Sequence, residues 1–199
     1  MKLAILATLA ACGGSAPATH YYTLPMAAKS AAPGTGPTLA IDTLEAARPY
    51  DDERMVYRAD AFRVDFYEYH RWAAPPGALV SDYLVEAFAR SGRFRAVGRE
   101  PNAQGAISIG GRVVALEEVD ATPQRWLGHV TVSLVATDRA TGRVLWTREL
   151  DDSEPMPTRS PDGLARAVGV ALARIADRAI PQVAELDRAH ASQTCASAP

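Results

Sequence analysis

Apolar and polar residues alternate with a period of two in several stretches of the chain, and each such stretch is predicted to be a half-buried strand. The alternation is clear over Phe62–Phe66 and again over Val130–Ala136. Residues 107–119 are apolar over a greater length and predict a long strand, in which the pair Gly110-Gly111 indicates a β-bulge or a sharp bend. Shorter strands are predicted at residues 21–24, 38–44, 55–58 and 94–97 and from Val144 onward.

Two stretches show the spacing of an amphipathic helix, with apolar residues recurring every three to four positions. The first opens at Pro75-Pro76, since proline is tolerated in the first helical turn, and ends before Gly92, a predicted C′ residue. The second opens at Ser160, a predicted N-cap, and Pro181 is expected to end or kink it. The acidic segment 151–157, which contains proline, is predicted to be a loop.

The predicted elements follow the order β-β-β-β-α-β-β-β-β-α, without an internal repeat. This order predicts a single α+β domain, in which two helices pack on one face of a mostly antiparallel sheet. The domain is expected to span residues 20–188. The small and polar residues 189–199 are expected to form a disordered tail.

The N-terminus has the pattern of a bacterial secretory signal that ends in a lipobox. Residues 1–11 combine one lysine with a short apolar run and are predicted to be a signal peptide, too short to span a bilayer. Cleavage before Cys12 would leave a cysteine that carries acyl chains such as palmitate, enough for a lasting membrane anchor. The alternative is a core strand with a core cysteine. The glycines and small residues that follow favour the first interpretation, with residues 12–19 as a flexible tether.

Charge and cysteine content narrow the classes of partner. The formal net charge is −2 and the chain has no Lys/Arg-rich run, which argues against binding to nucleic acid. Beyond Cys12 the chain has one other cysteine, Cys195, so no internal disulfide is expected. Cys195 is either a free or intermolecularly linked thiol or a tail residue without function.

No motif in the sequence indicates catalysis, a metal or a cofactor. The four histidines lack the spacing of metal ligands, and neither a nucleophile elbow nor a phosphate-binding loop is present. The acidic runs Asp51-Asp52-Glu53 and Asp151-Asp152-Ser153-Glu154 are either oxygen ligands for Ca²⁺ or, as their pattern favours, solvated charges. We therefore expect a protein that is not an enzyme, with no catalytic, metal-binding or cofactor-binding residues.

Aromatic residues gather in the segment that precedes the first predicted helix. Tyr67, Tyr69 and Trp72 lie within six positions of one another and are followed by Pro75-Pro76. They are candidates for a patch that docks a partner or a lipid. The alternative is that the corner between strand and helix packs its own core.

Several of these motifs together resemble the ABC-type transport auxiliary lipoproteins, a family that includes the lipoprotein of the paraquat-inducible (Pqi) intermembrane transport system. The resemblance covers most of residues 21–180 and is strongest over 54–97. Its most specific element is the Arg71-Trp72-Ala73 block before the helix. The other matching motifs are Tyr21-Tyr22-x-Leu24, Arg48-Pro49, Met55-Val56-Tyr57-Arg58 and Ser91-Gly92-x-Phe94-x-x-Val97.

The resemblance implies a non-enzymatic lipoprotein that faces the periplasm from the outer membrane. Its implied partners are inner-membrane ABC transporter subunits and an MCE-domain (mammalian cell entry) protein, which carry lipids across the envelope. Gly13 follows the cysteine in place of the aspartate that retains lipoproteins at the inner membrane, which favours the outer membrane. The ring shape of such partners is compatible with a homo-oligomer.

The implied mechanism is docking, in which the tether lets the globular domain receive the periplasmic end of the transport complex. The main alternative is a stand-alone periplasmic lipid-binding chaperone that holds an acyl chain between its helices and sheet. Two further alternatives are an envelope hydrolase and an assembly factor for lipopolysaccharide export.

Overall fold

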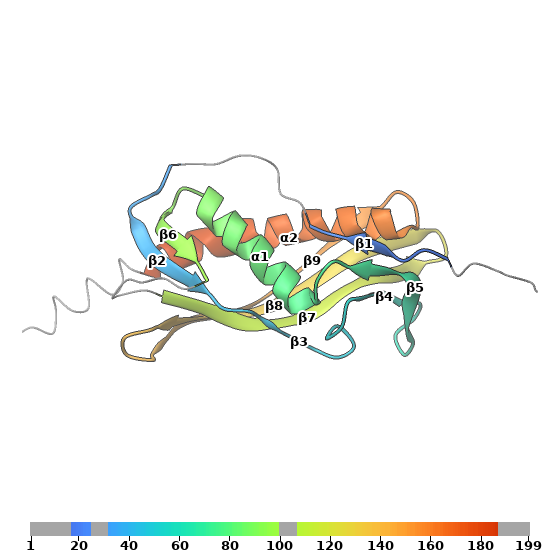
Figure 1. Ribbon diagram of the computed structural model, residues 1–199, viewed down its shortest axis with the longest axis horizontal. Coiled ribbons are helices and arrows are strands. Elements are labelled where there is room, and N and C mark those ends of the chain that lie inside the picture. The colour runs from blue at the N-terminus through green and yellow to red at the C-terminus, as the bar shows by residue number, and fades with distance from the viewer. Residues whose placement is uncertain (1–16, 25–31, 100–106, 187–199) are drawn as a thin grey trace, which may run out of the picture.

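A three-stranded antiparallel meander is the centre of the computed structural model, which describes residues 17–24, 32–99 and 107–186. The meander consists of β7 (Ile107–Thr122), β8 (Arg125–Asp138) and β9 (Val144–Met156). In Figure 1 both described helices lie on one face of the sheet to which these strands belong. The prediction of an α+β fold is therefore confirmed, with a nine-stranded sheet in the described part of the chain.

The free edge of β7 is covered by three short strands that follow one another along its length. They are β2 (Gly36–Ile41), β3 (Glu45–Ala46) and β4 (Arg54–Arg58), and all three run parallel to β7. β6 (Phe94–Gly98) extends the sheet beyond β2. At the other end β5 (Val64–Trp72) pairs antiparallel with β4, and β1 (His20–Tyr22) pairs parallel with β5. The short strand β3 was not predicted.

The two helices begin where the sequence predicts. α1 (Pro76–Arg90) has a proline at its first position, and Gly92 adopts φ 65° just beyond the C-cap. In α2 (Pro161–Ala184) the Ser160 hydroxyl oxygen accepts the backbone N–H of Gly163 at 3.0 Å, which confirms the predicted N-cap. Of the two expectations for Pro181, an end of the helix is wrong, because α2 continues to Ala184, and a kink stays a prediction. Packing of this last turn against the sheet, where Ile180 and Val183 are buried, outweighs the local preference of proline.

α2 approaches the sheet closely because small residues face each other across the interface. A Cβ added to Gly128 of β8 would lie 2.6 Å from the Cβ of Ala167. Several alanines of α2 are buried in the same interface, and this close packing explains why the helix is rich in alanine. The core between helices and sheet includes the fully buried residues Leu39, Ile41, Leu84, Phe88, Ile109, Leu116, Leu134, Leu164, Leu172 and Ile175.

Two other local predictions are wrong. The acidic segment 151–157 is not a loop, since all but its last residue lie in β9 and pair with β8. Arg174 of α2 reaches over this strand and binds Asp152 and Glu154, each at 2.8 Å, so the acidic side chains are compensated within the sheet. Phe62 does not point into the core, because it lies before β5 and is 99% exposed.

The glycine pair of the long strand does not produce the predicted bulge. Gly110 and Gly111 pair in register with Val135 and Leu134 of β8, and the register shifts instead between Val113 and Ala115 and between Asp120 and Thr122. Gly111 nevertheless requires glycine, because its φ is 143° and an added Cβ would lie 1.9 Å from the carbonyl oxygen of Ser133.

Candidate functional site

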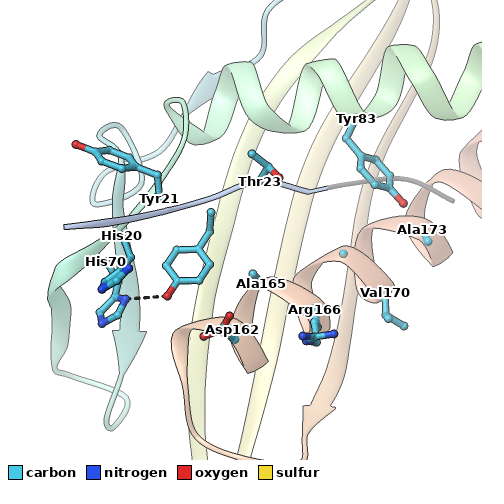
Figure 2. A pocket seen from close by; sticks show the side chains of 12 residues that line it. His20, Tyr21, Thr23, His70, Tyr83, Asp162, Ala165, Arg166, Val170 and Ala173 are labelled. Carbon is cyan, nitrogen blue, oxygen red and sulfur yellow. Dashed lines mark hydrogen bonds between the residues drawn. The ribbon is translucent and has the colours of Figure 1, made fainter. Parts of the chain in front are cut away.

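A pocket of about 1080 Å³ opens between β1 and α2, beside the corner where β5 leads into α1. Residues 20–23 form one wall, and His70 of β5 and Tyr83 of α1 contribute from the adjacent elements. The opposite wall is a stripe of α2 that runs from Asp162 to Ala173. Figure 2 shows these side chains converging from four elements that are distant in sequence.

One end of the pocket is polar. The hydroxyl of Tyr22 lies 2.9 Å from Nδ1 of His70, and the ring of His20 stacks on His70 with 5.4 Å between ring centres. Burial and the nearby carboxylate of Asp162 raise the pKa of Tyr22 above its ordinary value. Tyr22 is therefore a neutral phenol at physiological pH and can hydrogen bond to a ligand or to His70.

The other end of the pocket is apolar. Val170 and Tyr83 lie there, and the floor on α2 is made of small residues, including Gly169 and Ala173. A Cβ added to Gly169 would meet no atom within 4 Å, so this floor is open space rather than packed core. Tyr21 at 62% and Val170 at 43% are among the large apolar side chains that the described structure leaves exposed, and both line this pocket.

Gly169→Ala is expected to stabilise the protein by about 0.8 kcal/mol, because alanine is the better helix former and its methyl group has room. Urea unfolding followed by circular dichroism measures the change. Gly142→Ala is the matched control, since its Cβ also has room but its φ of 71° disfavours alanine. That change should destabilise by about 1 kcal/mol, and equal effects of the two variants would contradict the argument.

The three predicted docking residues do not form one exposed patch. The hydroxyl of Tyr67 donates to Oε2 of Glu118 at 2.6 Å, and its ring packs edge-on against Tyr57. Tyr69 is half-buried. Trp72 is 0% exposed, so it cannot contact a partner in this conformation. Trp72 fits the alternative interpretation, in which the strand-to-helix corner packs its own core.

Adjacent glutamates on β7 form two buried ion-pair networks that the sequence analysis did not single out. Glu117 accepts hydrogen bonds from the Tyr50 hydroxyl at 2.7 Å and from Nε of Arg58 at 3.1 Å. Burial alone would raise the pKa of Glu117, but the ion pair with His129 and the hydrogen bonds from Arg58 and Tyr50 outweigh it and lower the pKa. Burial and the hydrogen bond to Glu117 raise the pKa of Tyr50 to about 12. This carboxylate ties the turn before β4 to the centre of the sheet.

Glu118 ties the segment that leads into α2 to the centre of the sheet. Its side chain is 0% exposed and accepts Nε–H of Arg159 at 2.7 Å, in addition to the hydroxyl of Tyr67. Arg159 also pairs with Asp120 at 2.9 Å. Burial raises the pKa of Glu118 and outweighs the hydrogen bonds from Tyr67 and Arg159, which lower it. Two neighbouring glutamates inside a long apolar strand were the sequence signal for these networks.

His129 bridges two carboxylates on the face opposite the helices. Its Nδ1 lies 3.5 Å from Glu117, and its Nε2 lies 2.7 Å from Asp151. Glu117 and Asp151 raise the pKa of His129, although burial opposes them. The imidazolium therefore stabilises the fold fully below the unfolded pKa of about 6.5, and this contribution is lost as the pH rises through the higher folded pKa.

His129→Gln is expected to remove a pH-dependent part of the stability. The unmodified chain should have a larger free energy of unfolding at about pH 6 than the variant does, and this advantage should shrink at about pH 8.5. Chemical denaturation at the two pH values measures it. His70→Gln is the control, because His70 contacts Tyr22 and His20 rather than carboxylates. A difference between variant and parent that does not depend on pH would overturn the assignment.

Several predicted features lie outside the residues that the structure describes. The signal peptide, Cys12, the tail after 188 and Cys195 are outside the described ranges. Within 17–24, 32–99 and 107–186, no group of three or more potential metal-ligating side chains was found. None of the helices described is long and apolar enough to cross a membrane.

Comparison with known proteins identifies relatives of this chain by sequence family and by fold. A family model described as the ABC-type transport auxiliary lipoprotein component matches residues 22–179. A crystal structure of a Xanthomonas campestris protein of the family DUF330 superimposes with a TM-score of 0.76 at 20% identity, over 87% of this chain and 99% of that one. A second, uncharacterized protein superimposes with a TM-score of 0.69 at 11% identity, over 84% and 99% of the two chains. No match was found among curated proteins.

Proposed function

The chain belongs to the ABC-type transport auxiliary lipoprotein family, and from this premise we propose that it is an accessory lipoprotein of an ABC/MCE-type intermembrane lipid transport system. The observation that carries the proposal is the family match over residues 22–179, which extends from β1 through most of α2. The protein is anchored to the outer membrane through acylated Cys12 and faces the periplasm. It docks to an MCE-domain protein and its ABC transporter subunits rather than catalysing a reaction.

The disposition of charged groups supports docking. The buried glutamates of β7 bind arginines across strands and loops: Glu117 accepts from Arg58, and Glu118 accepts from Arg159. These interactions hold the long sheet rigid, which is what a platform for a protein partner needs. Such a role leaves the partner-binding surface to the exposed parts of the domain.

The tether limits how far the start of β1 can lie from the membrane. His20, the first residue of β1, lies eight positions after Cys12. A fully extended chain of that length spans about 27 Å. The β1 edge of the sheet is therefore held near the bilayer, and the opposite end of the domain is free to meet the transport complex.

Cys12→Ala is expected to release the protein from the outer membrane and to weaken recovery of its partners. Affinity purification of the full-length chain from its native envelope, with partners identified by mass spectrometry, measures the effect. The unmodified chain should recover an MCE-domain protein and ABC subunits. Cys195→Ala is the matched control and should behave like the unmodified chain. A chain that recovers no envelope transport protein would contradict the proposed function.

A further inference from the structure

We propose that the pocket between β1 and α2 binds a glycerophospholipid, with one acyl chain lying along α2 and the headgroup at the polar end. The inference rests on the proposed function for the source of the lipid, and it adds a ligand site to a protein otherwise described as a docking platform. Four properties of the pocket support it: its length, its gradient of polarity, its charges and its position.

The dimensions of the pocket suit an extended chain. The stripe of α2 that lines it runs from Asp162 to Ala173, which corresponds to about 16 Å at 1.5 Å per residue. Its volume of about 1080 Å³ lies at the upper end of the range for small-molecule sites. The small side chains at Ala165 and Gly169 leave a trough that a methylene chain can fill.

The polarity of the pocket changes from one end to the other, as an amphiphile requires. Figure 2 shows His20, His70 and Asp162 at one end and Val170 and Ala173 at the other. The exposed face of Val170, at the apolar end, is surface that an acyl chain would remove from water.

The charges at the rim match a zwitterionic headgroup. Asp162 and Arg166 both line the pocket and lie one helical turn apart on α2. A phosphate beside the guanidinium and an ammonium beside the carboxylate would satisfy both charges, as in phosphatidylethanolamine. The hydroxyl of Tyr22 offers a neutral hydrogen-bonding group next to them.

The position of the pocket brings it within reach of lipid. β1 forms one wall of the pocket. The chain between Cys12 and the start of β1 can span at most about 27 Å. The opening therefore lies near the membrane to which the proposed anchor attaches the protein. A lipid can therefore reach the pocket directly from the membrane.

The test uses the full-length chain reconstituted in vesicles of phosphatidylethanolamine and phosphatidylglycerol. A fraction of the phosphatidylethanolamine carries a diazirine at the end of one acyl chain, and adducts formed on irradiation are mapped by mass spectrometry. We expect adducts on residues 165–173 and on Tyr83. Wild-type protein without adducts at these positions would overturn the proposal.

Gly169→Leu and Ala89→Leu make the test specific. Leucine at position 169 projects into open space and fills the trough, so adducts at the pocket should fall about tenfold. Ala89 is an exposed position of α1, and the same change there should leave the adducts unaltered. Adducts that persist in Gly169→Leu would overturn the proposal, and circular dichroism verifies that both variants are folded.

Arg166→Gln tests the headgroup assignment. We expect the adducts at the pocket to fall about threefold, as for the loss of a solvent-exposed ion pair. No loss would overturn that assignment. The proposed function can fail while the lipid proposal holds. If adducts form but no MCE-domain protein is recovered, the chain is a stand-alone lipid carrier. If adducts are absent and Gly169→Leu weakens partner recovery, the pocket binds protein and the lipid proposal is wrong.

Discussion

Trp72→Ala is expected to lower the free energy of unfolding by about 4 kcal/mol, the cost of emptying the site of a large aromatic residue in a packed core. Trp72 is among the largest side chains that the fold buries completely, and it lies at the end of β5 just before α1. Removing it leaves a cavity at the corner where strand and helix meet. Urea unfolding followed by far-ultraviolet circular dichroism measures the loss.

Trp72→Phe separates packing from hydrogen bonding. The indole N–H of Trp72 is buried without a hydrogen-bond acceptor among the described residues. Phenylalanine keeps most of the ring and removes this unsatisfied donor, so the expected cost is only about 1.5 kcal/mol. Tyr69→Ala is the control, because it removes an aromatic side chain from a half-buried rather than a fully buried position of the same strand. A Trp72→Ala variant no less stable than Tyr69→Ala would show that Trp72 is not a core residue.

Gly111→Ala is expected to cost about 4 kcal/mol, since a strained backbone and an overpacked contact add at one position. The φ of 143° disfavours any side chain, and the new Cβ would lie 1.9 Å from the carbonyl oxygen of Ser133 on the neighbouring strand. The clash would force β7 and β8 apart near the middle of their pairing.

Gly98→Ala controls for the loss of glycine itself. Its Cβ would meet no atom within 4 Å, and it lies at the end of β6, so the change should alter stability by less than about 1 kcal/mol. Thermal and urea unfolding of both variants provide the comparison. Similar stabilities for Gly111→Ala and Gly98→Ala would refute the steric argument.

The elements that could be predicted are those whose signals are local. Ser160 caps α2, and Gly92 follows the end of α1 with positive φ, because capping depends on residues within one turn of the helix end. The failures are those in which a distant group decides. Residues 151–156 form a strand because they pair with β8, and Arg174, some twenty positions later, neutralises Asp152 and Glu154.

The candidate site could not be predicted for the same reason. Its residues come from β1, β5, α1 and α2, and no single motif in the sequence links these four segments. His20 and His70 are separated by 50 positions and become neighbours only because β1 pairs with β5 in parallel register. The aromatic cluster 67–72 was recognised from its composition, but burial divided it between core and surface.

The sequence by itself determined the α+β class and the start of both helices, because hydrophobic period and capping chemistry act over a few neighbouring residues, and its motifs indicated the family. It also carries the lipobox on which the expected anchor rests. Only the tertiary structure decided which charges are buried, where the long strand shifts its register, and that β1 and α2 enclose a pocket. These features depend on side chains far apart in the chain, whose contacts are set by sheet pairing and helix packing rather than by local preference.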